Sequence, residues 1–133
     1  MLTLSEFENL RTLRHEKIAH LIAAFKPQGS PIAVLVQEKL QGADVLTYLG
    51  SRHEYSEQIV ATIICQVLDA VQYLHWRGFS HLDLQPDNIV MASVRSHQIK
   101  LVDFGSAQPV SKLGSHVHMS AVNGNLDFIG KCF

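Results

Sequence analysis

Two short polar segments in the second half of the chain carry the residue types best suited to chemistry. The first is His-Leu-Asp-Leu-Gln-Pro-Asp-Asn at 81–88, and the second is Asp-Phe-Gly at 103–105, which begins fifteen positions after Asn88. A carboxylate can orient a hydroxyl group and accept its proton, and amide and carboxylate oxygens are hard ligands that suit Mg²⁺. Asp83 and Asp103 could also be ordinary turn carboxylates, because aspartate is common in loops. The two segments in this order favour a catalytic site over that alternative.

Together the two segments resemble the catalytic loop and the Asp-Phe-Gly magnesium loop of protein kinases. The resemblance implies that Asp83 is the catalytic base, and that Asn88 and Asp103 complete the catalytic set and bind the metal. It also places Gln85 near the transferring phosphate, where the family normally has a lysine. Removing one charge-stabilising donor typically raises a barrier by about 2.7–4 kcal/mol. We therefore expect either a weak kinase or a pseudokinase.

A second departure from the family concerns Leu82, where most kinases have an arginine that binds the phosphorylated activation loop. The resemblance then implies that phosphorylation of that loop does not switch the activity. His-Leu-Asp-Leu resembles the myosin light chain kinase, titin, obscurin and Trio/kalirin branch of the calmodulin-dependent kinase group. That branch implies transfer to serine and threonine, and a cytoskeletal or sarcomeric place within the cytoplasm.

The stretch VLVQEKLQGAD at 34–44 resembles the kinase hinge, which holds the adenine ring of ATP. The resemblance implies that backbone groups from Glu38 to Leu40 contact the adenine, that Asp44 binds the ribose and that Val90 lies under the base. Asp44 could instead cap the next helix, and Val90 could be an ordinary core residue of a strand. ATP and Mg²⁺ are therefore the expected cofactors.

The start of the chain has the pattern of an amphipathic helix over residues 3–14, with apolar side chains at helical spacing at Leu4, Phe7, Leu10 and Leu13. In a kinase this helix is αC, and the resemblance implies that Glu6 pairs with a strand lysine that this chain does not contain. Glu6 could equally complete a capping box with Thr3. The resemblance also matches four residues to the stacked side chains that join the two lobes of an active kinase, namely Leu10, Leu21, His81 and Phe104.

The remaining elements follow from hydrophobic periodicity and turn formers. β-rich runs at 18–25 and 32–38 predict one antiparallel hairpin, and runs at 89–92 and 98–103 predict a second, followed by an exposed loop. The order of helix, hairpin, two helices, hairpin and loop is α+β, and the resemblance makes it a partial protein-kinase fold.

Two helices are predicted between the hairpins. The shorter one, VLTYL, is expected to end at Gly50, and the longer one is expected to run from a cap at Ser56 to about His75. An apolar stripe predicts that the long helix lies in the middle of a core. The stripe consists of Ile59, Ile63, Val67, Val71 and Leu74, widened by Val60, Ile64 and Leu68.

The composition excludes several classes of partner. The chain has 133 residues and a formal net charge of −1, so it has no electrostatic footprint for nucleic acid or for an anionic membrane surface. Its longest apolar run, residues 59–74, is interrupted by Gln66, Asp69 and Gln72, which argues against a membrane span. No signal peptide is recognisable, and Cys65 is expected to be a small buried residue, so we expect a reducing compartment.

The resemblance covers nearly the whole chain but only about half of a kinase domain. Residues 1–38 are expected to be a remnant of the small lobe, and 39–133 the first half of the large lobe. We expect the chain to belong to a larger multidomain protein with a protein substrate, and to have little activity by itself. The alternatives are a pseudokinase-like binding or scaffolding module, and an inactive product of splicing or of an incomplete gene model.

Overall fold

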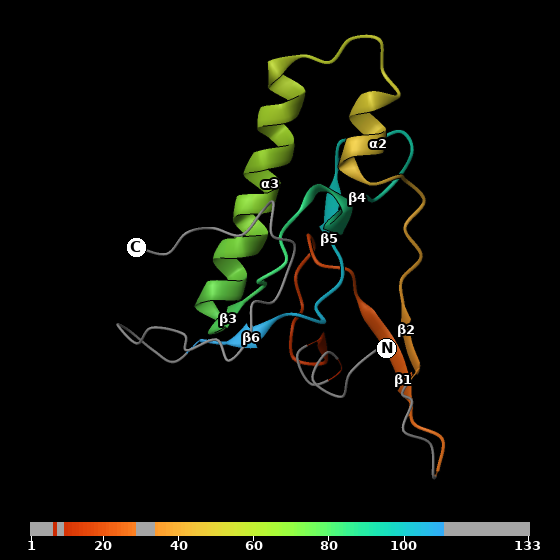
Figure 1. Ribbon diagram of the computed structural model, residues 1–133, viewed down its shortest axis with the longest axis vertical. Helices are drawn as coiled ribbons and strands as arrows, with labels where there is room; N and C mark the ends of the chain where they lie inside the picture. The colour runs from red at the N-terminus through yellow and green to blue at the C-terminus, as the bar shows by residue number, and fades with distance from the viewer. Residues whose placement is uncertain (1–6, 8–9, 29–33, 111–133) are drawn as a thin grey trace.

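The structure of the chain is a computed structural model, which describes residues 7, 10–28 and 34–110. In this part of the chain a pair of strands is followed by two helices and then by the remaining short antiparallel strands (Figure 1), as expected for the predicted α+β class. In chain order the elements are β1 Leu21–Phe25, β2 Val34–Gln37, α2 Val45–Gly50, α3 Glu57–Trp76, β3 Phe79–Ser80, the 3₁₀ turn η1 Pro86–Asn88, β4 Ile89–Met91, β5 Ile99–Leu101 and β6 Gln108–Pro109.

The strands form two-stranded antiparallel ladders. Strand β1 pairs with β2, and β4 pairs with β5 with Val90 opposite Lys100, which confirms both predicted hairpins. A third ladder joins β3 to β6, with Ser80 opposite Gln108. The sequence analysis expected only a loop after Asp103 and was wrong here, because a strand of two residues is too short to show any periodicity.

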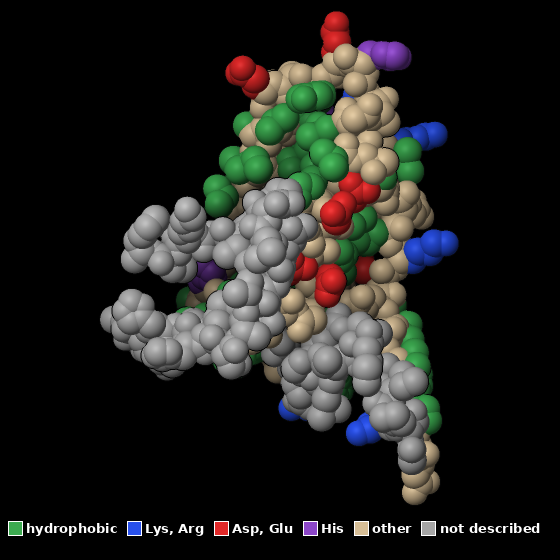
Figure 2. All heavy atoms as spheres, viewed as in Figure 1, with side chains coloured by type: hydrophobic (Ala, Val, Ile, Leu, Met, Phe, Trp, Pro, Cys, Tyr) green, Lys and Arg blue, Asp and Glu red, His purple; other side chains and the backbone are tan. Residues whose placement is uncertain are grey.

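Helix α3 begins as predicted, because the Ser56 hydroxyl accepts a hydrogen bond from the Ile59 amide at 3.3 Å. Its buried residues form one narrow stripe, Ile63, Val67, Ala70 and Leu74. The predicted widening of the stripe is wrong, since Ile64 is 47% exposed and Leu68 is 60% exposed. Cys65 is also exposed. Figure 2 shows such apolar side chains on the visible face over α3.

By length and composition alone, α3 is the one helix in the described part of the chain that could cross a membrane. That test is weak, because the core helix of a soluble protein passes it too. The buried stripe of α3 belongs to the same core cluster as Leu101 and Phe104, whereas its apolar residues Ile64, Leu68 and Trp76 are exposed.

Helix α2 is fixed at its start by Asp44, whose Oδ1 accepts a hydrogen bond from the Thr47 amide at 2.8 Å. Gly50 is the last helical residue and not the stop, since the C-cap is Ser51 with an ordinary right-handed φ of −77°. Another glycine is needed just before α2. A Cβ on Gly42 would lie 2.5 Å from the Cβ of Met91, so only glycine allows the segment after β2 to approach strand β4 so closely.

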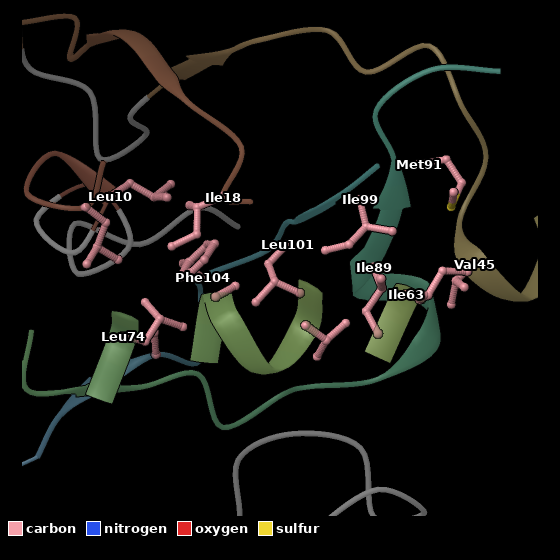
Figure 3. Packing of buried hydrophobic residues seen from close by; sticks show 14 of the residues in the cluster. Leu10, Ile18, Val45, Ile63, Leu74, Ile89, Met91, Ile99, Leu101 and Phe104 are labelled. Carbon is pink, nitrogen blue, oxygen red and sulfur yellow. The ribbon is translucent and has the colours of Figure 1, made fainter. Parts of the chain in front are cut away.

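The core lies between residues 10–18, α3 and the β4–β5 hairpin. Figure 3 shows Leu101 and Phe104 near the turns of α3, with Ile18 and Leu10 beside them. The largest fully buried side chains are Phe104, Leu10, Ile18, Leu74, Met91, Ile99 and Leu101. Since the two predicted catalytic segments follow α3 and β5, the same core holds both of them in place.

The predicted first helix lies largely outside the described residues. Phe7 and Leu10 are helical, and the Arg11 amide donates to the Phe7 carbonyl at 3.0 Å, as a helix requires. Glu6 lies outside the described residues, so its pairing stays a prediction.

Candidate active site

The first polar segment leaves α3 through strand β3 and ends in the turn η1. Pro86 opens this turn, and the Asn88 amide donates to the Gln85 carbonyl at 3.0 Å. Proline suits the first position of a helical turn because its missing N–H would have no partner there. The turn closes the segment back on itself, so that the Asn88 side chain, only 7% exposed, points towards Asp83.

Two side-chain amides converge on the Asp83 carboxylate. Asn88 Nδ2 donates to Asp83 Oδ2 at 3.0 Å and to the Asp83 carbonyl at 2.8 Å. Gln85 Nε2 donates to the same Oδ2 at 3.1 Å. Hydrogen bonds from two directions to one oxygen fix the plane of the carboxylate, so Asp83 is held in one orientation.

His81 lies beneath the segment and is 5% exposed. Its Nδ1 lies 3.4 Å from the Asp83 amide, which donates to it, and its Nε2 lies 3.2 Å from the Val102 carbonyl. An acceptor role for Nδ1 leaves the proton on Nε2, and the ring is neutral. Burial lowers the pKa of His81 by more than the Val102 carbonyl and the nearby aspartates raise it. The ring packs against Phe104, with centroids 4.8 Å apart.

The second polar segment is turned by an unusual backbone conformation. Asp103 has a φ of +58° and Leu82, in the first segment, has a φ of +63°, both in the left-handed region. Such a conformation costs a residue other than glycine on the order of 1–3 kcal/mol and is concentrated at functional sites. At Asp103 it sends the Phe104 ring into the core, where it is 0% exposed, while the carboxylate stays exposed and accepts a hydrogen bond from the Gly105 amide at 3.1 Å.

The two polar segments are joined by backbone. Val102 directly precedes Asp103, and its amide donates to the Asn88 carbonyl at 3.0 Å. Asn88 is therefore bonded through its side chain to Asp83 and through its carbonyl to the residue before Asp103. The structure thus brings together the three residues predicted to be catalytic.

The segment from Glu38 to Asp44 runs from β2 to α2 alongside the β4–β5 hairpin (Figure 1). The amides of Glu38, Gln41 and Gly42 donate to the carbonyls of neighbouring strands or turns. Between them, the backbone of Leu40 has no hydrogen-bond partner in the described part of the chain. An open backbone amide and carbonyl at this position can bind the edge of a planar ring.

The comparisons with known proteins give a consistent result. Residues 1–130 match the protein kinase domain. This chain belongs to the protein kinase domain family. The predicted family and the partial kinase fold are confirmed.

Three curated relatives show where in the family the kinase chain lies. It is 44% identical over 108 residues to the muscle M-line assembly protein unc-89 of Caenorhabditis elegans, covering 81% of this chain and 1% of that protein. It is 36% identical over 108 residues to human serine/threonine-protein kinase ULK3, covering 81% and 22%. It is 37% identical over 126 residues to the striated muscle preferentially expressed protein kinase of Danio rerio, covering 95% and 4%. The kinase chain thus spans less than a quarter of each relative's length.

A solved structure agrees with these relatives. The autoinhibited serine kinase domain of the giant muscle protein titin matches with a TM-score of 0.74 and 30% identity, over 81% of this chain and 33% of that chain. The predicted resemblance to the branch of myosin light chain kinase, titin, obscurin and Trio/kalirin is therefore confirmed.

The donor set of the kinase site fits Mg²⁺. Since the Asn88 amide nitrogen is bonded to Asp83, the Asn88 amide oxygen remains to act as a ligand beside the exposed carboxylate of Asp103. Among the described residues, no group of three or more His, Cys, Asp or Glu side chains is placed to hold a metal ion. An amide oxygen and a carboxylate are hard ligands, and a magnesium ion usually completes its shell with water and phosphate oxygens.

The other two residues predicted to bind the nucleotide, Val90 and Asp44, lie at strand β4. Val90 is half-buried in β4 and forms a β-bridge with Asp44. Asp44 does cap α2, and hydrogen bonds from Thr47 lower the pKa of the Asp44 carboxyl. The alternative prediction, that Asp44 caps the next helix, is therefore confirmed. The binding of ribose by Asp44 stays a prediction.

One residue of this region was missed by the sequence analysis. Lys100 Nζ lies 2.6 Å from Glu38 Oε1. Its isolated charge between the buried residues Ile99 and Leu101 was a signal that a partner was needed, but nothing in the sequence points to a partner 62 positions away.

Proposed function

We propose that this chain carries the catalytic and magnesium-binding part of a protein serine/threonine kinase, which transfers the γ-phosphate of ATP to a hydroxyl group of a protein substrate. The observation that carries the proposal is the convergence of Asn88 and Gln85 on Asp83 Oδ2, at 3.0 and 3.1 Å. A carboxylate held in this way can orient a substrate hydroxyl and accept its proton.

Each catalytic residue has a role that its contacts support. Asp83 is the base, Gln85 and Asn88 hold its carboxylate, and the neutral His81 ring supports the loop from below. The oxygens of Asn88 and Asp103 would hold Mg²⁺. When bound, Mg²⁺ neutralises the charge that develops on the phosphate oxygens.

The nucleotide would lie between the hinge segment and strand β4. The open backbone of Leu40 and the carbonyl of Glu38 would bind the adenine edge, and Val90 would lie under the ring. Asp44 would bind the ribose with the oxygen that does not cap α2. Glu6 would pair with a lysine of the small lobe.

We further infer a boundary between the lobes after Glu38, with residues 1–38 in the small lobe and 39–133 in the large lobe. Its support is that β1 and β2 pair only with each other among the described strands, and that Glu38 directly follows β2. Because three of the matched proteins have muscle in their names, we also propose a cytoskeletal or sarcomeric place in the cytoplasm, within a larger multidomain protein.

Gln85 favours a second candidate function, a pseudokinase-like binding or scaffolding module. Its amide is occupied by Asp83 and carries no charge, whereas the lysine usual at this position stabilises the phosphate in transfer. Such a module would bind a partner, and transfer would be slow or absent.

Equilibrium binding of ATP, with and without Mg²⁺, tests the proposal. We expect binding that requires Mg²⁺ and that Asp103→Asn weakens, while Asp87→Asn, on an exposed neighbouring carboxylate, leaves it unchanged. Binding that is equally strong in the presence of a chelator, or that Asp87→Asn weakens just as much, would contradict the proposed metal site.

A further inference from the structure

The side chain of Glu38 joins parts of the chain that are distant in sequence. Its Oε1 accepts a hydrogen bond from the His20 amide at 2.7 Å and one from Lys100 Nζ at 2.6 Å. In the backbone, the Glu38 amide donates to the His20 carbonyl at 2.9 Å. Glu38 is thus bonded to the chain just before β1 and to strand β5.

The contact with Lys100 is partly protected from solvent. The Lys100 side chain is 19% exposed and the Glu38 side chain 30% exposed. Burial alone would raise the pKa of Glu38, but the hydrogen bonds from Lys100 and His20 outweigh it and lower the pKa. Ion pairs with restricted access to solvent are screened less by salt than exposed pairs.

The position of Lys100 makes the contact relevant to the site. Lys100 lies three residues before Asp103 in the chain and opposite Val90 in the β4–β5 ladder. Glu38 begins the segment whose open backbone at Leu40 would bind the adenine. One ion pair therefore ties the proposed adenine-binding segment to the strand that leads into the magnesium loop.

We propose that Lys100 is a positioning residue for the nucleotide site: through Glu38 it holds the hinge backbone, residues 38–42, against strand β5. This inference rests on the proposed function for its link to ATP. The contact between Lys100 and Glu38, which we call the brace, is itself a property of the fold. Lys100 need not touch the nucleotide.

Hydrogen–deuterium exchange of peptides covering residues 38–42, measured without nucleotide, tests the brace. Lys100→Met keeps the aliphatic stem and removes the charge, and Glu38→Gln keeps an oxygen for the His20 amide. We expect exchange about two- to fivefold faster in either variant, no further gain in the double variant, and rescue by Lys100→Arg. Glu16→Gln changes a side chain that is 75% exposed and removes its ion pair with Lys17 (3.2 Å), so it serves as the matched control, with no change at 38–42.

The affinity for Mg²⁺-ATP is then measured on the same variants. We expect it to fall by a similar factor in Lys100→Met and Glu38→Gln, and to return in Lys100→Arg. Unchanged exchange in both single variants, or effects that add in the double variant, would overturn the brace. Failure of the unaltered chain to bind ATP would count against the proposed function alone, because the exchange experiment contains no nucleotide.

Discussion

Removal of the Asn88 side chain should destabilise the fold and inactivate the site together. Asn88 is 7% exposed, and its Nδ2 donates at 2.8 Å to the Asp83 carbonyl and at 3.0 Å to the Asp83 carboxylate. A hydrogen bond to a neutral group contributes about 0.5–1.5 kcal/mol and one to a charged group about 1.5–3 kcal/mol. For Asn88→Ala we therefore expect a loss of about 2–4 kcal/mol in the free energy of unfolding.

The assay is thermal unfolding followed by circular dichroism, with urea unfolding as a second measure. At about 3–5 °C per kcal/mol for a domain of this size, Asn88→Ala should lower the Tm by roughly 6–20 °C. The control is Gln98→Ala, on an exposed amide for which we expect a change within about 0.5 kcal/mol. A loss below about 1 kcal/mol for Asn88→Ala would refute the reasoning, because the two hydrogen bonds would then not hold the loop.

Three further outcomes follow from other contacts. Gln66→Ala removes side-chain bonds to the His97 carbonyl (2.7 Å) and the Ile99 amide (3.2 Å), so it should cost about 1–3 kcal/mol in urea unfolding, and a neutral result would show that water replaces both bonds. Because the pKa of buried His81 lies below its ordinary 6.5, the unfolded state takes up a proton first as pH falls below that value, and stability should drop there. The Tm should therefore fall less steeply with decreasing pH in His81→Phe than in the unaltered protein. An identical pH dependence would contradict the assignment of His81 as a buried neutral ring. Gln85→Lys should raise phosphate transfer by about two to three decades in a slow enzyme, whereas no transfer in either form would favour the scaffold.

The features predictable from the sequence were those encoded by local patterns. Both hairpins follow from alternating apolar runs bounded by turn formers, and the caps at Asp44 and Ser56 follow from residue type next to an apolar run. The two polar segments were recognisable because their residues are contiguous. The β4–β5 hairpin between the two segments brings their ends together, which allows the Val102 amide to donate to the Asn88 carbonyl.

The features that could not be predicted depend on where distant parts of the chain meet. Periodicity gives the direction of the apolar face of α3 but not its width, so Ile64 and Leu68 were wrongly expected to be buried. The β3–β6 ladder is made by two residues on each side, too few for a pattern. The Glu38–Lys100 ion pair crosses 62 positions, and only the three-dimensional fold brings its partners together.

The most direct test of the central claim is transfer of labelled γ-phosphate from Mg²⁺-ATP to serine- and threonine-containing peptides by the full-length protein that carries this chain. Asp83→Asn is compared with Asp87→Asn, which changes an exposed carboxylate four positions further on. We predict transfer that Asp83→Asn abolishes and that Asp87→Asn leaves intact. Transfer that survives Asp83→Asn would contradict the assignment of the base and, with it, the proposed site.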